Sequence, residues 1–242
     1  SGNGLELEIM LTAVKADVME KLCAAAESAG FPVQRAAASC LALYHAFRHN
    51  YPSVSGPVLV ADIGARSTNL LLVGPADHFF ARTFALAGNA VTAAMAGELR
   101  LDFARAEALK TEISSGRPAL ADSADAPAAL RRASGSFLHR LQLEMARTAG
   151  NFSCRSGAEA PVAIYLTGGG SLLAGLDTAL AAALKVPVET LDPLRQVDVS
   201  DAARKSGADV STHMLANLVG LAAPGAAKAG ATCPRTCAPA RS

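Results

Sequence analysis

Three short strand-like runs, one directly after another, constrain the fold of this chain more than any other feature. The runs are VLVADIG (Val58 to Gly64), STNLLLV (Ser67 to Val73) and HFFARTF (His78 to Phe84). Only a few residues separate each run from the next, and links this short favour antiparallel neighbours in a meander. A parallel pairing would need a crossover of a dozen or more residues. The sequence therefore predicts a three-stranded antiparallel unit from Val58 onward.

Helical periodicity follows this meander. Apolar residues three or four positions apart predict two helices, the second capped by Asp102. The side chains expected to face inward are those of Val91, Met95, Leu99, Phe103, Ala106, Leu109 and Ile113. A long helix is predicted over Leu130 to Phe152, with Phe137, Leu141, Met145 and Thr148 inward.

Strands and helices then alternate to the end of the patterned region. The expected elements are a buried strand at Val162 to Thr167, a helix at Leu176 to Leu184, a strand at Val186 to Leu191 and a helix at His213 to Leu221. Three antiparallel strands followed by helix, strand, helix, strand and helix resemble the ribonuclease-H-like unit that actin, Hsp70 and sugar kinases contain twice. The predicted fold class is α/β, with a mixed sheet and flanking helices, and one full copy of this unit is found.

The segment before Val58 is too short for a second copy. Strand-like runs at Leu5 to Val14 and Val33 to Ala38 alternate with two helices, which predicts a partial α/β subdomain with parallel strand pairing. The first of these helices is expected to begin with a capping box, Asp17 and Glu20, and to bury Val18, Leu22 and Ala26. The second runs through Leu41, Tyr44 and Phe47.

The expected domain organisation follows from these patterns. Residues 1–56 form the partial subdomain, residues 57–222 form the main domain with a mobile loop at 117–128, and residues 223–242, rich in Ala, Gly and Pro, form a disordered tail.

Charge and composition exclude several classes of function. The formal net charge is +1, so the chain lacks the basic excess expected of a nucleic-acid-binding protein. No stretch is long and apolar enough for a transmembrane helix, so any membrane contact is expected to pass through a partner. The five cysteines are an odd number, and most have apolar, helix-like neighbours, which predicts buried free thiols. Cys233 and Cys237 lack a second pair at the spacing of a zinc site.

The first candidate motif is the turn between the first two strands. Asp62 and Gly64 are followed by two hydroxyl residues, Ser67 and Thr68. Glycine lets a backbone approach a ligand closely, and the amides and hydroxyls of such a turn can hold phosphate oxygens. Asp62 could hold Mg²⁺ through water or orient an attacking water. The alternative is an ordinary hairpin turn, since Asp and Gly are common turn residues.

The second motif is the run Gly168, Gly169, Gly170 and Ser171, which joins a buried strand to a helix. Consecutive glycines let a flat base or a phosphate approach the backbone, and the start of a helix supplies free amides. A flexible connection is the alternative, although three glycines in a row carry a conformational-entropy cost.

The third motif is the pair Glu107 and Lys110, three residues apart on one predicted helix face. The ordinary interpretation is a surface ion pair. The alternative is a clamp in which Glu107 accepts hydrogen bonds from ribose hydroxyls and Lys110 donates. The pair alone does not choose between the two.

Taken together in this order, the motifs resemble the PilM and FtsA branch of the actin/Hsp70 superfamily, and the PilM family of type IV pilus assembly proteins most. The Asp62 turn is similar to that branch's second phosphate motif, and Glu107 with Lys110 matches its ribose-contacting AExxK. The run LTGGGSLLAGL (Leu166 to Leu176) is similar to its adenosine motif, and VPVETLDPL (Val186 to Leu194) resembles the PilM segment that follows. The resemblance extends over roughly Leu7 to Leu221.

The resemblance implies a function. A PilM-like protein is expected to bind ATP or ADP with Mg²⁺ at these motifs and to act as a cytoplasmic scaffold of a pilus or secretion machine. It would hold the cytoplasmic tail of a PilN-like bitopic inner-membrane protein and contact other pilus components, and so lie at the inner membrane through partners.

One departure from the family pattern affects this expectation. The family's first phosphate motif, another Asp-x-Gly hairpin, is absent, and we expect the chain to be truncated at its N-terminus. Half of the phosphate site would then be missing, so nucleotide binding by this chain alone is expected to be weak or absent, without ATP turnover.

Three other functions compete with the scaffold. A small-molecule kinase of the same superfamily would need catalytic and substrate-binding polar residues beyond Asp62, and none is evident. An FtsA-like filament protein would end in an amphipathic membrane-targeting helix, whereas this tail has little apolar periodicity. A ribonuclease-H-type nuclease would need several carboxylates on the first strands, and the hairpin has one.

Overall fold

The computed structural model describes residues 13–74, 78–116, 124–156, 159–206, 212–223 and 231–232. The chain forms two compact units: residues 1–38 with 227–242, and residues 39–226. The expected boundary near residue 56 therefore moves to residue 38. The reason is that helix α2 (Ser39–Asn50) packs on strand β3 (Thr68–Val73) and helix α8 (Ala216–Ala222) of the larger unit.

The smaller unit contains helix α1 (Ala16–Ser28) and two short strands, β1 (Arg35–Ala36) and β7 (Ala231–Thr232). The strands pair antiparallel, with Arg35 opposite Thr232. Most of the strand expected at residues 5–14 lies outside the described residues, so the predicted parallel pairing is not tested. The predicted disordered tail is wrong at residues 231–232, which form β7, and residues 224–230 and 233–242 lie outside the described part.

The face of α1 differs from the predicted one. The capping box is wrong because the helix begins after Lys15, which places Asp17 inside the first turn with no side-chain cap. Cys23 is the buried residue, whereas Val18 and Leu22 are 42% and 62% exposed. Apolar residues occur on more than one side of this helix, so periodicity could not identify the buried stripe.

The larger unit is built on a five-stranded sheet with the order β4-β3-β2-β5-β6. Its strands are β2 (Val58–Ile63), β3 (Thr68–Val73), β4 (Phe79–Phe84), β5 (Ala163–Thr167) and β6 (Val188–Thr190). Strands β2, β3 and β4 pair antiparallel, and β5 and β6 join them in parallel. The predicted meander and mixed sheet are confirmed. Strand β2 is central, and all six of its residues are buried.

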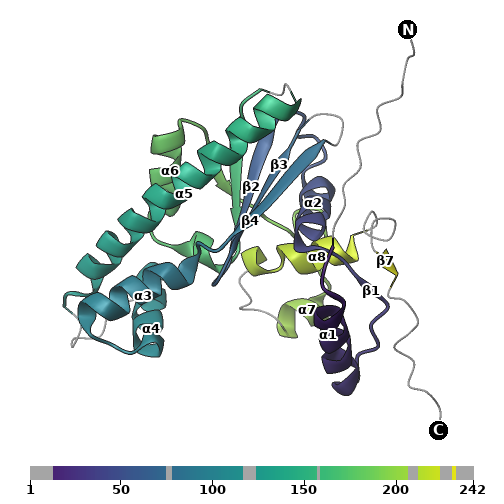
Figure 1. Cartoon of the computed structure of the whole chain (residues 1–242), viewed down its shortest axis with the longest axis horizontal. Helices are drawn as coiled ribbons and strands as arrows, with labels where there is room; N and C mark the ends of the chain where they lie inside the picture. The colour runs from purple at the N-terminus through teal and green to yellow at the C-terminus, as the bar shows by residue number, and fades with distance from the viewer. Residues whose placement is uncertain are drawn as a thin grey trace. The chain divides into compact units, whose positions relative to one another are not determined.

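Helices cover both faces of this sheet (Figure 1). One face packs against α5 (Ala126–Ser156) and α6 (Leu176–Leu184), and α3 (Gly88–Leu99) and α4 (Phe103–Ser114) pack on α5 and join the same core. The inward residues predicted for α5 are confirmed: Phe137, Leu141, Met145 and Thr148 are buried. One prediction on this face is wrong. Phe103 is 46% exposed, because it is the first residue of α4 and the buried stripe starts at Ala106.

The prediction of a mobile loop at 117–128 is wrong at the end of that range. Residues 126–128 belong to α5, because Pro127 occupies the first helical turn, where the missing amide costs nothing. Residues 117–123 lie outside the described part of the chain.

The opposite face packs against α2 and α8 (Ala216–Ala222). Two short elements, α7 (Asp201–Ser206) and the 3₁₀ turn η4 (Thr212–Met214), precede α8. Helices α2 and α8 cross at Gly220, where a β-carbon would overlap the carbonyl oxygen of Ala42. This crossing fixes α8 against the sheet and so positions the residues at its start.

Candidate functional site

The site begins at the carboxyl end of the central strand β2. Asp62 lies opposite Asn69 of the antiparallel neighbour β3 and opposite Thr167 of the parallel neighbour β5. The Asp62 side chain is nearly buried, with an exposed fraction of 9%. Ligands of open α/β sheets bind at the carboxyl ends of the strands, so this is the expected place for a functional carboxylate.

Two side-chain amides hold one oxygen of Asp62. The Nδ2 atom of Asn69 donates to Asp62 Oδ2 at 3.2 Å, and the Nδ2 atom of Asn217 on α8 donates to the same oxygen at 2.9 Å. Asn69 in turn accepts a hydrogen bond of 2.7 Å from the Thr83 hydroxyl. Hydrogen bonds to a carboxylate stabilise its charge and fix its orientation. Asp62 is therefore held rigidly, with Oδ1 directed toward the backbone of Gly168.

Two glycines of the triplet are required by packing. Gly168 has a φ of +83°, and a β-carbon there would lie 2.5 Å from Asp62 Oδ1 and 2.6 Å from the carbonyl oxygen of Ile63. A β-carbon at Gly170 would also collide with Ile63. At Gly169 a β-carbon would meet no atom within 4 Å, and this residue is exposed. The triplet therefore packs tightly on β2, while Gly169 faces open space.

The backbone of η4 and the Ser171 side chain hold the triplet in place. The carbonyl oxygen of His213 accepts hydrogen bonds from the Thr167 hydroxyl and from the Gly168 amide, the latter at 3.0 Å. The Ser171 hydroxyl donates to the carbonyl oxygen of Gly168 at 2.7 Å, which closes the turn η3 (Gly169–Leu172). In this structure the Ser171 hydroxyl therefore stabilises the turn.

The turn after Asp62 is joined to the start of α3. The Gly64 amide donates to the carbonyl oxygen of Ser67 at 3.1 Å, and the Gly88 amide donates to the carbonyl oxygen of Gly64 at 3.0 Å. Ser67 is half-buried. Thr68 is fully buried, and its hydroxyl donates to the carbonyl oxygen of Leu86 at 2.6 Å. The Thr68 hydroxyl is thus committed to the fold and is not available to a phosphate.

Glu107 and Lys110 form more than a surface ion pair. Lys110 Nζ lies 2.7 Å from Glu107 Oε2, 2.9 Å from the Thr92 hydroxyl and 3.4 Å from the carbonyl oxygen of Gly88. Thr92 also donates a short hydrogen bond to Glu107 Oε2. The Lys110 side chain is only 13% exposed, whereas that of Glu107 is 42% exposed. The network fixes Lys110 against the start of α3 and leaves part of Glu107 at the surface.

The network also sets the charge of Glu107. Burial by itself raises the pKa of Glu107, but hydrogen bonds from Lys110 and Thr92, together with the lysine charge, outweigh burial and leave the pKa below its ordinary value. Glu107 is therefore an ionised hydrogen-bond acceptor at neutral pH, as an interaction with hydroxyl groups requires.

Direct contacts link all three motifs predicted from the sequence. Gly168 packs on Asp62, the turn after Asp62 is bonded to Gly88, and Lys110 reaches the carbonyl oxygen of Gly88. These residues are far apart in the sequence, and the fold brings them to one end of the sheet.

Four residues at this site were missed by sequence reasoning. They are Asn69, Thr92, His213 and Asn217, which hold Asp62, Glu107, Lys110 and Gly168. Asn69 was detectable, because it is the partner of Asp62 in a tight hairpin register. Asn217 and His213 carry no local signal, since their position depends on how α8 crosses α2.

Two histidines of this unit lose part of their hydration in the fold. Within the part of the chain that the structure describes, His45 of α2 and His213 of η4 each have a buried Nε2 atom without a hydrogen-bond partner. Burial lowers the pKa of both histidines below the ordinary 6.5. As pH falls through 6.5, the unfolded chain takes up protons that the fold resists. Their contribution to stability is therefore full above pH 6.5 and is lost on acidification.

This predicts an acid-sensitive fold. The urea midpoint of unfolding should be lower at pH 5.5 than at pH 7.5. In the double variant His45→Gln, His213→Gln, this decrease in the midpoint should be clearly smaller. Matched urea titrations at the two pH values measure it. An equal fall in both proteins would contradict the assignment.

No group of three or more His, Cys, Asp or Glu side chains within the described residues is placed to hold a metal ion. Of the cysteines that the structure describes, Cys23 is buried, Cys40 is half-buried and Cys154 is exposed. The prediction of buried thiols is therefore wrong for Cys154. In the same part of the chain, no helix combines the length and apolarity needed to cross a membrane.

Comparison with protein families gives a match over residues 2–225 to the model described as type IV pilus assembly protein PilM. The chain belongs to the PilM family. A solved structure titled PilM-PilN type IV pilus biogenesis complex is similar, with 27% identity and a TM-score of 0.68. The match covers 84% of this chain and 56% of that one, so the chain spans little more than half the length of this PilM-family relative.

More distant structures share the fold alone. The ethanolamine utilization protein EutJ from Carboxydothermus hydrogenoformans matches at 15% identity and a TM-score of 0.52, over 81% of this chain and 58% of that one. MreB 5 of Spiroplasma citri, bound to AMPPNP, matches at 16% identity and a TM-score of 0.54, over 87% of this chain and 65% of that one. The fold is thus that of the actin-like ATPases. No curated protein matches the chain.

Proposed function

We propose that the three motifs form this chain's part of a site for an adenine nucleotide, ATP or ADP with Mg²⁺, which the chain alone binds weakly. The observation that carries the proposal is the chain of contacts from Gly168 through Asp62 and the Gly64 turn to Gly88 and Lys110. A carboxylate, a lysine, an accessible glycine and a surface-reaching glutamate then stand at one end of the sheet. A few polar groups placed together in this way can orient a ligand that carries a sugar, a base and a phosphate–metal group.

Each residue suits one part of such a ligand. Glu107, ionised and partly exposed, can accept hydrogen bonds from ribose hydroxyls, while Lys110 and Thr92 hold its carboxylate in place. Gly169 leaves open space in which a base can lie against the backbone. Asp62, fixed by two amides, can hold Mg²⁺ through water, and bound Mg²⁺ would neutralise phosphate charge. The Gly64 turn and Ser67 would border the phosphates.

Isothermal titration calorimetry with Mg-ATP and Mg-ADP tests the proposal, on this chain and on a longer parent protein where one exists. Asp62→Ala should weaken binding about tenfold or more, since a tenfold change in affinity is about 1.4 kcal/mol and a fixed carboxylate near the metal exceeds that. Glu159→Ala is the matched control, because Glu159 is exposed and lies at the amino end of β5, away from the site. Absence of binding heat in every protein would remove the nucleotide assignment.

We further propose that the chain is part of a cytoplasmic scaffold for a type IV pilus or a related secretion machine. In this role it would hold the cytoplasmic tail of a PilN-like inner-membrane protein and stay at the membrane through that partner. Membership of the PilM family and the similarity to a PilM-PilN complex support this. The test is calorimetry with a synthetic peptide of the cytoplasmic tail of the PilN-type protein from the same organism. Saturable binding is expected, and binding no tighter than that of a scrambled peptide would contradict it.

A further inference from the structure

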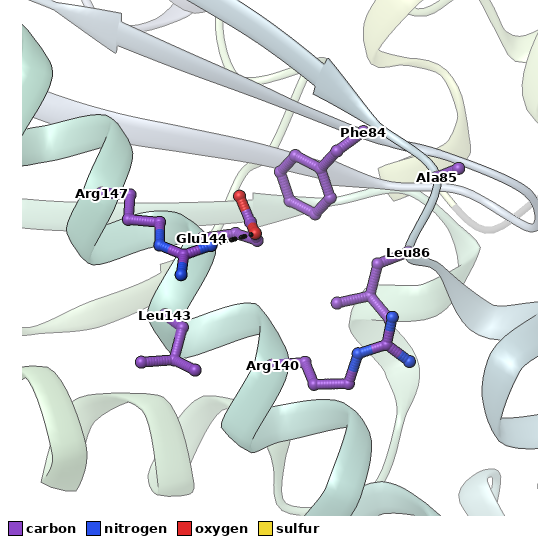
Figure 2. A pocket seen from close by; sticks show the side chains of 7 residues that line it. All are labelled: Phe84, Ala85, Leu86, Arg140, Leu143, Glu144 and Arg147. Atoms are coloured by element: carbon purple, nitrogen blue, oxygen red, sulfur yellow. Dashed lines mark hydrogen bonds and ion pairs between the residues drawn. The ribbon is translucent and has the colours of Figure 1, made fainter.

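A pocket on the outer part of the sheet-bearing unit lies apart from the residues of the proposed nucleotide site. It has a volume of about 320 Å³ and lies between α5 and the segment that leaves β4. The lining residues are Phe84, Ala85, Leu86, Arg140, Leu143, Glu144 and Arg147. Figure 2 shows Phe84 and Leu86 on one side and the side chains of α5 on the other.

The charges around this pocket are unbalanced toward positive. The Glu144 carboxylate forms ion pairs with two arginines, Arg82 at 2.7 Å and Arg147 at 3.1 Å. Among the described residues no ion pair or hydrogen bond of Arg140 is found, and Arg147 keeps 66% of its side chain exposed. The pocket therefore presents two guanidinium groups, seven residues apart on one helix, in a chain whose net charge is only +1. Guanidinium groups arranged in this way favour carboxylates, which they can bind with two hydrogen bonds each.

Apolar side chains line part of the space between the two arginines, beside the Glu144 carboxylate. Leu143 lies between them in the sequence and is 46% exposed, and Phe84 and Leu86 contribute the opposite wall. In Figure 2 the Glu144 side chain lies beside Phe84, and the Leu143 side chain projects from a separate position on α5. An apolar side chain inserted there would be removed from water, while its neighbours could reach the arginines.

The location leaves the pocket open to a partner. Strand β4 is at one edge of the five-stranded sheet, and within the described residues no other strand pairs with its outer side. An edge strand presents unpaired backbone groups, which extended peptides commonly use for docking.

We propose that this pocket docks an extended acidic segment of a partner protein, with one apolar side chain between Leu143 and Phe84 and flanking carboxylates on Arg140 and Arg147. Charge complementarity selects this occupant over an apolar or basic one. The proposal does not depend on nucleotide binding, since none of its residues belongs to that site.

Fluorescence anisotropy with a labelled peptide of alternating leucine and glutamate tests it on the intact chain. Saturable binding is expected, and the double variant Arg140→Gln, Arg147→Gln should weaken it about tenfold or more, as for two charge-assisted contacts. Leu143→Ala should weaken it about threefold to fivefold, as for a partly buried apolar contact. Arg131→Gln is the matched control, because Arg131 is an exposed arginine of α5 outside the pocket.

Several outcomes would overturn the proposal. Equal binding of an alternating leucine and glutamine peptide would remove the role of charge, and equal binding of an all-glutamate peptide would remove the apolar anchor. No saturable binding, or binding unchanged in the pocket variants, would reject the site. Concentration-dependent dimerisation abolished by the double arginine variant, without peptide competition, would assign the surface to a second copy instead.

Discussion

Replacing Gly220 with alanine is expected to lower the free energy of unfolding of the sheet-bearing unit by about 3 kcal/mol or more, the upper end of overpacking effects. A β-carbon there would overlap the carbonyl oxygen of Ala42 and lie 2.5 Å from its carbonyl carbon. The obstacle is the backbone of α2, which cannot move aside like a flexible side chain. The two helices would have to separate, and their contact with the sheet would loosen.

Urea denaturation of Gly220→Ala measures this effect, and Gly97→Ala is its control. Gly97 lies in α3, where a β-carbon would meet nothing within 4 Å, so that variant should gain up to about 1 kcal/mol from helix propensity. Because Asn217 stands one turn before Gly220, the Gly220 variant should also bind nucleotide less tightly. Equal stability of the two variants would show that α2 and α8 do not cross as described.

Gly168→Ala is expected to cost about 3 kcal/mol of stability, of which about 1 kcal/mol comes from the positive-φ backbone and the rest from collision. The collision involves Asp62 Oδ1 and the carbonyl oxygen of Ile63, both within 2.6 Å of the added carbon. Gly169→Ala should leave stability within about 0.5 kcal/mol of the parent, since open space surrounds that position.

Thermal and urea unfolding of the two glycine variants separate packing from ligand contact. If Gly169 faces a bound base, Gly169→Ala keeps the fold and weakens nucleotide binding, whereas Gly168→Ala loses both. A Gly168 variant as stable as the parent would contradict the packing of the triplet on β2.

Much of the fold could be predicted because its signals are local. Short turns between VLVADIG, STNLLLV and HFFARTF dictated an antiparallel meander, and Asp102 is the N-cap of α4, with its side chain accepting from the Arg105 amide at 2.8 Å. Helix α6 has the predicted limits, Leu176 to Leu184. In each case neighbouring residues carry the information.

Several failures are cases where a distant contact decides. Helix α2 has an ordinary amphipathic pattern, and its packing on α8 and β3 assigns it to the sheet-bearing unit. Thr68 belongs to a motif typical of phosphate binding. Its hydroxyl nevertheless donates a hydrogen bond to the carbonyl oxygen of Leu86, eighteen residues away in the chain. The role of Asn217 depends on a helix crossing 155 residues after Asp62. Local periodicity contains none of this.

Within the candidate site, the sequence predicted which segments meet but not what each residue does. Of the three consecutive glycines, two are required for packing and one faces open space. The amino-acid sequence alone does not distinguish them. The Glu107 and Lys110 pair is typical of a surface ion pair, and Thr92, on another helix, makes it a fixed network.

The central claim is that the Asp62 turn, the Glu107 and Lys110 pair and the glycine triplet form one nucleotide site. Amide NMR of the chain, titrated with Mg-ADP, tests it most directly. The account predicts that the Gly64, Gly88 and Gly169 signals shift together and yield one dissociation constant. Shifts confined to one of these places, or different dissociation constants at each, would contradict it.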